Sequence, residues 1–192
     1  MAALAPWVVS DHFEELGRPP RLLHGGFGLL TVGNLAKPKW WALALAQRLG
    51  DTGLPATVTG DGAESLVQAW AAKAGGDVGV LVWNGTLDHA RAGGDPALSR
   101  RVGVRVTGLA DREYALRTWR VDEEHNNVVA RWRAMAGAPA DWPDEAQWER
   151  LAAADRLDEL PPDTVRPAGD GTVEITIELP MPGIAYLELS PG

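Results

Sequence analysis

The sequence predicts a mostly β protein: an antiparallel β-sandwich with a helical insert, preceded by one strand–loop–helix unit of the kind that builds (β/α)8 barrels. After Gly50, about seven short apolar or alternating segments are separated by turn residues, which is typical of a sandwich. Between about residues 126 and 160 the apolar spacing becomes helical. The first 50 residues instead pass from an apolar strand through a polar loop into a helix, the layout of a βα unit.

The βα unit begins with a strand expected over residues 4–11. A long loop follows over residues 12–36, rich in glycine and carrying acidic and aromatic residues. Loops of this length in compact domains are usually functional or disordered, and this composition favours an ordered site loop. A helix is predicted from Lys37 to Leu49, with Pro38 in its first turn and Gly50 after its end. One face of this helix is apolar and is expected to need a packing partner.

The expected sandwich strands lie at residues 78–83, 102–106, 114–121, 173–179 and 183–189, with weaker candidates at 57–59 and 65–73. The pair at 173–179 and 183–189 is expected to form a hairpin across the proline-rich turn at 180–183. We place the domain boundary at residues 50 and 51, so that residues 51–192 form the sandwich with its insert.

The insert is expected to hold two helices. The first covers residues 126–136, with Asn126 or Asn127 as its N-cap and the acids at 122–124 as favourable charges near its N-terminus. The second starts near Pro143, and its apolar stripe is Trp148, Leu151 and Ala152.

Composition excludes several classes of function. The net charge of −8 and the pI near 5.0 argue against nucleic-acid binding, because no basic patch could neutralise phosphates. The absence of cysteine excludes disulfides, thiolate metal sites and cysteine nucleophiles. No apolar run approaches the length of a membrane helix, and no signal peptide is legible, so we expect a cytoplasmic protein without membrane contact.

The chain resembles glycoside hydrolase family 39, the β-xylosidase and α-iduronidase family. The matching stretches occur in order at Trp7 to Leu30, 37–50, 82–84, 120–127, Trp132 and Met135. The resemblance covers nearly the whole chain and implies the C-terminal portion of a β-xylosidase, in which residues 1–50 supply the last βα unit of the barrel.

The resemblance implies hydrolysis of β-xylosides with retention of configuration, which needs two carboxyl groups flanking the scissile bond. In the family, the acid/base glutamate follows an Asn-Glu-Pro motif and the nucleophile ends a later strand. Neither feature is present, so we assign no catalytic residue and predict that this chain alone is inactive. The implied partners are xylose-containing oligosaccharides, with no cofactor and no metal. The candidate substrate-binding residues are Trp7, Glu14, Glu15, His24 and Phe27.

Carboxylates that accept hydrogen bonds from sugar hydroxyls would fix the orientation of the ring, which suits Glu14 and Glu15. As a catalytic pair they are unsuitable, because adjacent residues on an extended backbone point in opposite directions. The alternative is that both residues only cap the loop or keep it solvated. A metal cluster of Asp11, His12, Glu14 and His24 fits no ligand spacing, and the Gly25–Gly28 segment lacks the pattern of a phosphate loop.

A different class of function is a stand-alone carbohydrate-binding or interaction module, because the sandwich and the nine tryptophans are compatible with it. Against it stands the helix at residues 37–49, whose apolar face would lack a partner. That face is also a candidate surface for self-association or for binding a barrel partner.

Overall fold

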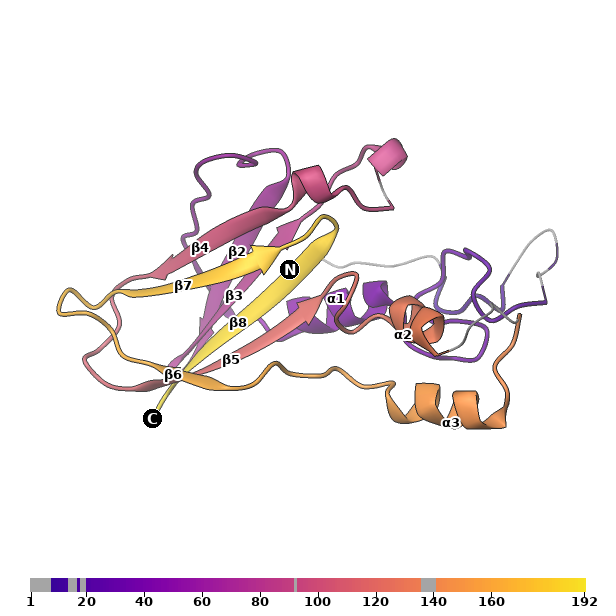
Figure 1. Ribbon diagram of the computed structural model, residues 1–192. Helices are drawn as coiled ribbons and strands as arrows, with labels where there is room; N and C mark the ends of the chain where they lie inside the picture. The colour runs from indigo at the N-terminus through magenta and orange to yellow at the C-terminus, as the bar shows by residue number, and fades with distance from the viewer. Residues whose placement is uncertain (1–7, 14–16, 18–19, 92, 136–140) are drawn as a thin grey trace. The chain divides into compact units, whose positions relative to one another are not determined.

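A computed structural model of the chain describes residues 8–13, 17, 20–91, 93–135 and 141–192 (Figure 1). The chain divides into two compact units. The first comprises Met1–Leu43 and Asn126–Leu157, and the second comprises Ala44–His125 and Asp158–Gly192. The segment expected as a helical insert therefore belongs to the same unit as the N-terminal segment.

Two antiparallel sheets make up the second unit. The larger has the strand order β1-β2-β3-β8-β5-β6, and the smaller pairs β4 with β7. Figure 1 shows β4 and β7 as a pair outside the larger sheet. The strands are β1 (Thr52–Leu54), β2 (Val67–Ala74), β3 (Asp77–Asn84), β4 (Arg100–Val106), β5 (Tyr114–Val121), β6 (Asp163–Val165), β7 (Val173–Leu179) and β8 (Gly183–Pro191). Two short 3-10 turns, His89–Arg91 and Pro96–Leu98, lie between β3 and β4.

The core of this unit lies between the two sheets. Leu187 on β8 and Val82 on β3 are at most 2 % exposed, and they cluster with Ile177 and Leu179 of β7 from the other sheet. Alternation places these side chains on the inner face of each strand. The predicted mostly β fold, with antiparallel sheets packed as a sandwich, is confirmed.

The expected hairpin between the last two strands is wrong. β7 pairs with β4, whereas β8 lies between β3 and β5 in the larger sheet. The two segments differ in pattern for this reason: β7 alternates apolar with polar residues, while most of β8 is buried on both faces. Such continuous burial is typical of a central strand. The turn at residues 180–182 carries the chain from one sheet to the other.

The weak strand candidate at residues 57–59 is also wrong. The strand lies earlier, at β1, where Thr52 to Leu54 pair with Lys73 to Ala71 of β2. Pro55 follows directly and has no N–H to continue the ladder. The second weak candidate is confirmed as β2, shifted by one or two residues.

The described residues form three α-helices: α1 (Pro38–Gln47), α2 (Val128–Ala134) and α3 (Glu145–Ala153). The Asn127 side chain accepts hydrogen bonds from the N–H groups of Val129 and Ala130, which confirms it as the N-cap of α2. A capping box formed by Asp144 and Gln147 begins α3. The core of the first unit is the apolar cluster of Leu22, Leu35, Val128, Trp132 and Leu151.

Candidate functional site

The candidate site is built on the N-terminal segment, where two stretches run parallel. Ser10 and Leu30 form a parallel bridge, and the N–H of Asp11 donates to the carbonyl of Leu30 at 3.0 Å. The N–H of Leu30 in turn donates to the carbonyl of Val9 at 2.9 Å. The expected loop over residues 12–36 therefore contains an extended stretch at its far side. These bonds fix both ends of the loop, at Asp11 and at Leu30.

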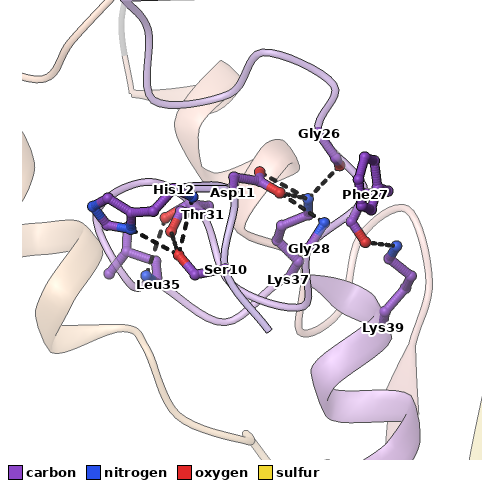
Figure 2. A network of polar contacts seen from close by, with 10 residues as sticks. All are labelled: Ser10, Asp11, His12, Gly26, Phe27, Gly28, Thr31, Leu35, Lys37 and Lys39. Carbon is purple, nitrogen blue, oxygen red and sulfur yellow. Dashed lines mark hydrogen bonds and ion pairs between the residues drawn. The ribbon is translucent and has the colours of Figure 1, made fainter. Parts of the chain in front are cut away.

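A buried ion pair holds the glycine-rich part of this loop (Figure 2). Both carboxylate oxygens of Asp11 lie 2.9 Å from Nζ of Lys37, and the two side chains are only 2 % and 13 % exposed. The N–H of Gly28 donates to Oδ1 of Asp11 at 2.8 Å, and Nζ of Lys37 also donates to the carbonyl of Gly26 at 2.6 Å. Asp11 and Lys37 therefore clamp the loop backbone at two points.

The clamp explains why glycine occupies positions 26 and 28. A Cβ added at either position would lie 2.6 Å from Oδ1 of Asp11, well inside van der Waals contact. A Cβ at Gly26 would also lie 2.8 Å from Cε1 of His24, so the imidazole and the carboxylate approach the same stretch of backbone. The loop thus packs its main chain directly against the buried charge.

Lys39 adds a further tie, from α1 to the loop. Its Nζ donates to the carbonyl of Phe27 at 2.5 Å. Burial lowers the pKa of Lys39, the nearby charge of Lys37 lowers it further, and Asp11 acts in the opposite direction. Lys37 and Lys39 lie in the Lys-Pro-Lys run at the start of α1, so this helix start is what fixes the loop.

Of the predicted substrate-binding residues, His24 and Phe27 lie on this clamped loop. His24 is half-buried, and the Phe27 side chain is 47 % exposed. Trp7, Glu14 and Glu15 lie outside the described residues, so their placement stays a prediction. Phe13, which the sequence did not single out, is 41 % exposed at the opposite end of the same loop. Exposed aromatic rings offer flat apolar faces to a ligand.

Of the strand expected over residues 4–11, the described residues 8–11 form only the isolated Ser10–Leu30 bridge. Next to this bridge, the Oγ of Ser10 lies 2.8 Å from Nδ1 of His12, and the N–H of His12 donates to the same Oγ. This is a local turn that orients the exposed imidazole. Asp11, by contrast, has its carboxylate engaged by Lys37 and Gly28 and acts as a structural anchor. Sequence analysis considered Asp11 as a polar residue after the expected strand and as a rejected metal ligand, and it did not predict this anchoring role.

The second polar run, at residues 122–127, also proves structural. Oδ1 of Asp122 accepts hydrogen bonds from the N–H groups of Glu124 and His125 and lies 2.8 Å from Nδ1 of the His125 ring. Burial favours a higher pKa for Asp122, but these hydrogen bonds and the charge of Arg120 outweigh it and lower the pKa. Asp122 therefore fixes the turn ahead of the N-cap Asn127, while the favourable charge of the acids at 122–124 near the helix N-terminus stays a prediction.

Among the described residues, no cluster of three or more His, Asp or Glu side chains could hold a metal ion. In the same part of the chain, no helix is long and apolar enough to cross a membrane.

Comparison with known proteins identifies the family. The model of glycosyl hydrolases family 39 matches residues 1–171, most of the chain. The chain belongs to this family. It is 27 % identical over 186 residues to a β-xylosidase from Geobacillus stearothermophilus, a match that covers 95 % of the chain but 32 % of the relative.

Solved structures of family 39 proteins are similar in fold. A GH39 enzyme from Xanthomonas axonopodis pv. citri matches with a TM-score of 0.75 and 26 % identity, covering 97 % of this chain and 36 % of that one. A monomeric β-xylosidase from Caulobacter crescentus matches with a TM-score of 0.73 and 25 % identity, covering 98 % and 38 %. This family 39 chain therefore spans about a third of the length of the relatives that it matches.

Proposed function

We propose that this chain supplies the substrate-binding loop of a retaining glycoside hydrolase acting on β-xylosides, and that both catalytic carboxylates lie on polypeptide beyond this chain. The observation that carries the proposal is the clamped loop. Asp11 and Lys37 bond to the backbone of Gly28 and Gly26, on either side of Phe27, within a chain that belongs to family 39. A loop fixed in this way can present side chains to a sugar without first being ordered by it.

Within this proposal each candidate residue has a role. Trp7 and Phe27 offer apolar faces to the sugar ring. Glu14 and Glu15 accept hydrogen bonds from sugar hydroxyls. Because the carboxylates are charged, these hydrogen bonds are stronger than those between neutral groups. His24 orients the loop from its half-buried position beside Asp11. None of these roles requires a metal or a cofactor.

The first test uses the 192-residue chain and a p-nitrophenyl β-xyloside. We expect no turnover, because the chain has no Asn-Glu-Pro motif and no second strand bearing a nucleophile. The second arm reads the genomic DNA upstream of the Met1 codon in frame, and we expect it to encode a barrel with both glutamates. Genuine turnover by the chain alone, or an upstream stop codon with no barrel in any frame, contradicts the proposal.

If that longer polypeptide is produced, Glu14→Gln and Glu15→Gln should each lower kcat/KM about 10- to 100-fold, because a charged hydrogen bond contributes about 1.5–3 kcal/mol. Glu178→Gln, at a site 61 % exposed on β7, is the matched control and should leave kcat/KM unchanged. Equal effects of the three substitutions would argue against the assigned loop roles.

The second candidate is a carbohydrate-binding module, and the Trp70–Trp83 pair favours it. These rings lie edge to face with centroids 5.0 Å apart, and Trp70 is 57 % exposed. Titration of the isolated chain with xylo-oligosaccharides separates the two functions. Saturable binding that Trp70→Ala abolishes would favour the module, whereas absence of binding favours the larger enzyme.

A further inference from the structure

The tripeptide Gly-Asp-Gly occurs twice in the second unit, at residues 60–62 and 169–171. An aspartate followed by glycine is prone to a reaction with its own backbone, because glycine has no side chain to keep the carboxyl away from the next amide nitrogen. Two identical tripeptides have similar reactivity in an unfolded chain. A difference between them in the folded chain therefore comes from the structure.

The copy at residues 169–171 has both reacting groups held in place. The N–H of Gly171 donates to the carbonyl of Ala168 at 2.8 Å, and Oδ1 of Asp170 accepts a hydrogen bond from the N–H of Thr172 at 3.0 Å. The carbonyl of Gly171 also accepts a hydrogen bond from the N–H of Leu109 at 3.0 Å. A reaction between Asp170 and Gly171 must first break these bonds, so the fold opposes it.

The copy at residues 60–62 is held much less. In the part of the chain that the structure describes, the nitrogen of Gly62 makes no hydrogen bond. The Asp61 side chain is 83 % exposed and pairs with Nη2 of Arg100 at 3.0 Å. An ion pair with one partner this exposed contributes little, so little is lost when the carboxyl turns towards the backbone. Both reacting groups of this copy can therefore approach each other.

A third pair of the same kind, Asn84-Gly85, is protected by burial. Asn84 is 1 % exposed, and its amide donates to the carbonyls of Leu98 and Leu179 at 2.8 and 3.0 Å. The N–H of Gly85 donates to the carbonyl of Leu66 at 3.0 Å. The sequence contains no further Asp-Gly or Asn-Gly pair. Of the three, only Asp61-Gly62 combines an exposed side chain with an unbonded amide nitrogen.

We propose that Asp61 converts spontaneously to isoaspartate in the folded chain, through a cyclic succinimide formed with Gly62, and that it is the preferred site of this modification. The Gly62 nitrogen attacks Cγ of the uncharged Asp61 carboxyl. The bond between this nitrogen and Cγ forms, the nitrogen gives its proton to solvent, and the carboxyl hydroxyl leaves as water.

Water then opens the ring at either of its two carbonyl carbons. Breaking the new bond between the Gly62 nitrogen and Cγ restores aspartate. Breaking the original peptide bond instead leaves the main chain running through Cγ, and the former main-chain carbonyl becomes a carboxylate. One water is released and one is consumed, so the mass is unchanged and no oxidant or cofactor takes part.

The modification has a structural consequence at the start of β2. The carbonyl of Gly62 accepts hydrogen bonds from the N–H groups of Leu66 and Val67, both at 2.8 Å. Isoaspartate adds one methylene to the main chain directly before Gly62, and its carboxylate sits on a shorter arm, away from Arg100. Because Val67 belongs to the sandwich core, the first residues of β2 open more often in the modified chain.

The test compares the two Gly-Asp-Gly copies in folded chain and in chain unfolded with guanidinium chloride, both aged at neutral pH. Proteolytic peptides are analysed by electron-transfer fragmentation, which distinguishes isoaspartate from aspartate. We expect the ratio of isoaspartate at residue 61 to that at residue 170 to be at least fivefold higher in the folded chain. An equal ratio in the two states overturns the proposal. So does a folded chain without isoaspartate at residue 61 after a time in which the unfolded chain has converted.

Two matched variants locate the reaction by a second readout, labelling by an isoaspartyl methyltransferase with S-adenosylmethionine. Asp61→Glu keeps the negative charge but would need a six-membered ring, which forms far more slowly. We expect it to lower the labelling of aged folded chain at least fivefold without changing the thermal midpoint. Asp170→Glu is the control and should label within twofold of the original chain. An equal loss of labelling in the two variants contradicts the proposal.

Amide exchange tests the consequence for β2. Exchange at Leu66 and Val67 should become faster as the original chain ages, in proportion to its isoaspartate content, and should stay unchanged in aged Asp61→Glu. Unchanged exchange in aged original chain would contradict the loosening of β2.

Discussion

Asp11 carries a buried negative charge that Lys37 balances at 2.9 Å. Replacing Asp11 with Asn leaves the Lys37 ammonium buried without a counter-charge, and breaking a buried pair in this way costs about 3–5 kcal/mol. We expect Asp11→Asn to lower the free energy of unfolding by this amount and to accelerate amide exchange at Gly28. Urea denaturation and hydrogen exchange measure the two effects.

The control for Asp11→Asn is Glu178→Gln, which removes an ion pair whose side chains are 76 % and 61 % exposed. Exposed pairs contribute about 0–1 kcal/mol, so a small effect is expected. Similar losses for the two substitutions would show that the clamp does not stabilise the loop.

At the residue scale, sequence reasoning located Asp11 but not its role. The pair joins positions 26 residues apart, and its burial depends on the packing of the glycine loop. No local pattern encodes such a contact. The Lys-Pro-Lys run was read only as a helix start. Of the predicted site, His24 and Phe27 are placed on the loop, whereas Trp7, Glu14 and Glu15 stay predictions.

At the scale of an element, the turn ahead of α2 depends on the ionised form of Asp122. The pKa of Asp122 is lowered in the folded chain, against about 3.9 when unfolded. A lowered carboxyl pKa stabilises the fold above the unfolded pKa, and this stabilisation is lost as pH falls through the folded value. We therefore expect Asp122→Asn to lower the free energy of unfolding at pH 7. Below about pH 4, the free energies of unfolding of the variant and the original chain should become more similar.

Urea denaturation of both chains at several pH values checks the prediction for Asp122. Asp111→Asn is the control, because Asp111 is 83 % exposed and its loss should cost little at any pH. The amide shifts of Glu124 and His125 report the titration directly, since both N–H groups donate to this carboxylate. A titration midpoint at or above 3.9 would contradict the prediction.

Strands could be predicted where the alternation of apolar and polar residues repeats several times. β5 and β7 were predicted with their observed ends, because each carries seven or eight residues of regular pattern. β1 and β6 were missed because three residues are too few to establish a period. Both are defined by pairing with longer neighbours, β2 and β5, rather than by their own sequence.

At the scale of the whole molecule, the sequence predicted the fold class but not every strand partner. The turn at 180–183 suggested a hairpin, yet it connects two sheets. The amide of Asn84, at the end of β3, shows why: it donates to the carbonyls of Leu98 and Leu179, joining the end of β7 to the opposite sheet. Strand order depends on such contacts between distant segments, and alternation alone does not specify it.

The sandwich should be energetically uneven, because most of β8 is buried, whereas the inward-facing valines of β4 are only half-buried and line a hollow of about 640 Å³. Leu187 is 2 % exposed in the closed part, so Leu187→Ala should cost about 2–5 kcal/mol through lost burial and the cavity left behind. Val104 lines the hollow and is only half-buried, so Val104→Ala should cost about 1 kcal/mol, from ~0.8 kcal/mol per fully buried methylene. Native-state hydrogen exchange of β8 amides measures both losses in free energy. Equal losses for Leu187→Ala and Val104→Ala would mean that the interior is packed equally well at β8 and at β4, which would contradict this prediction.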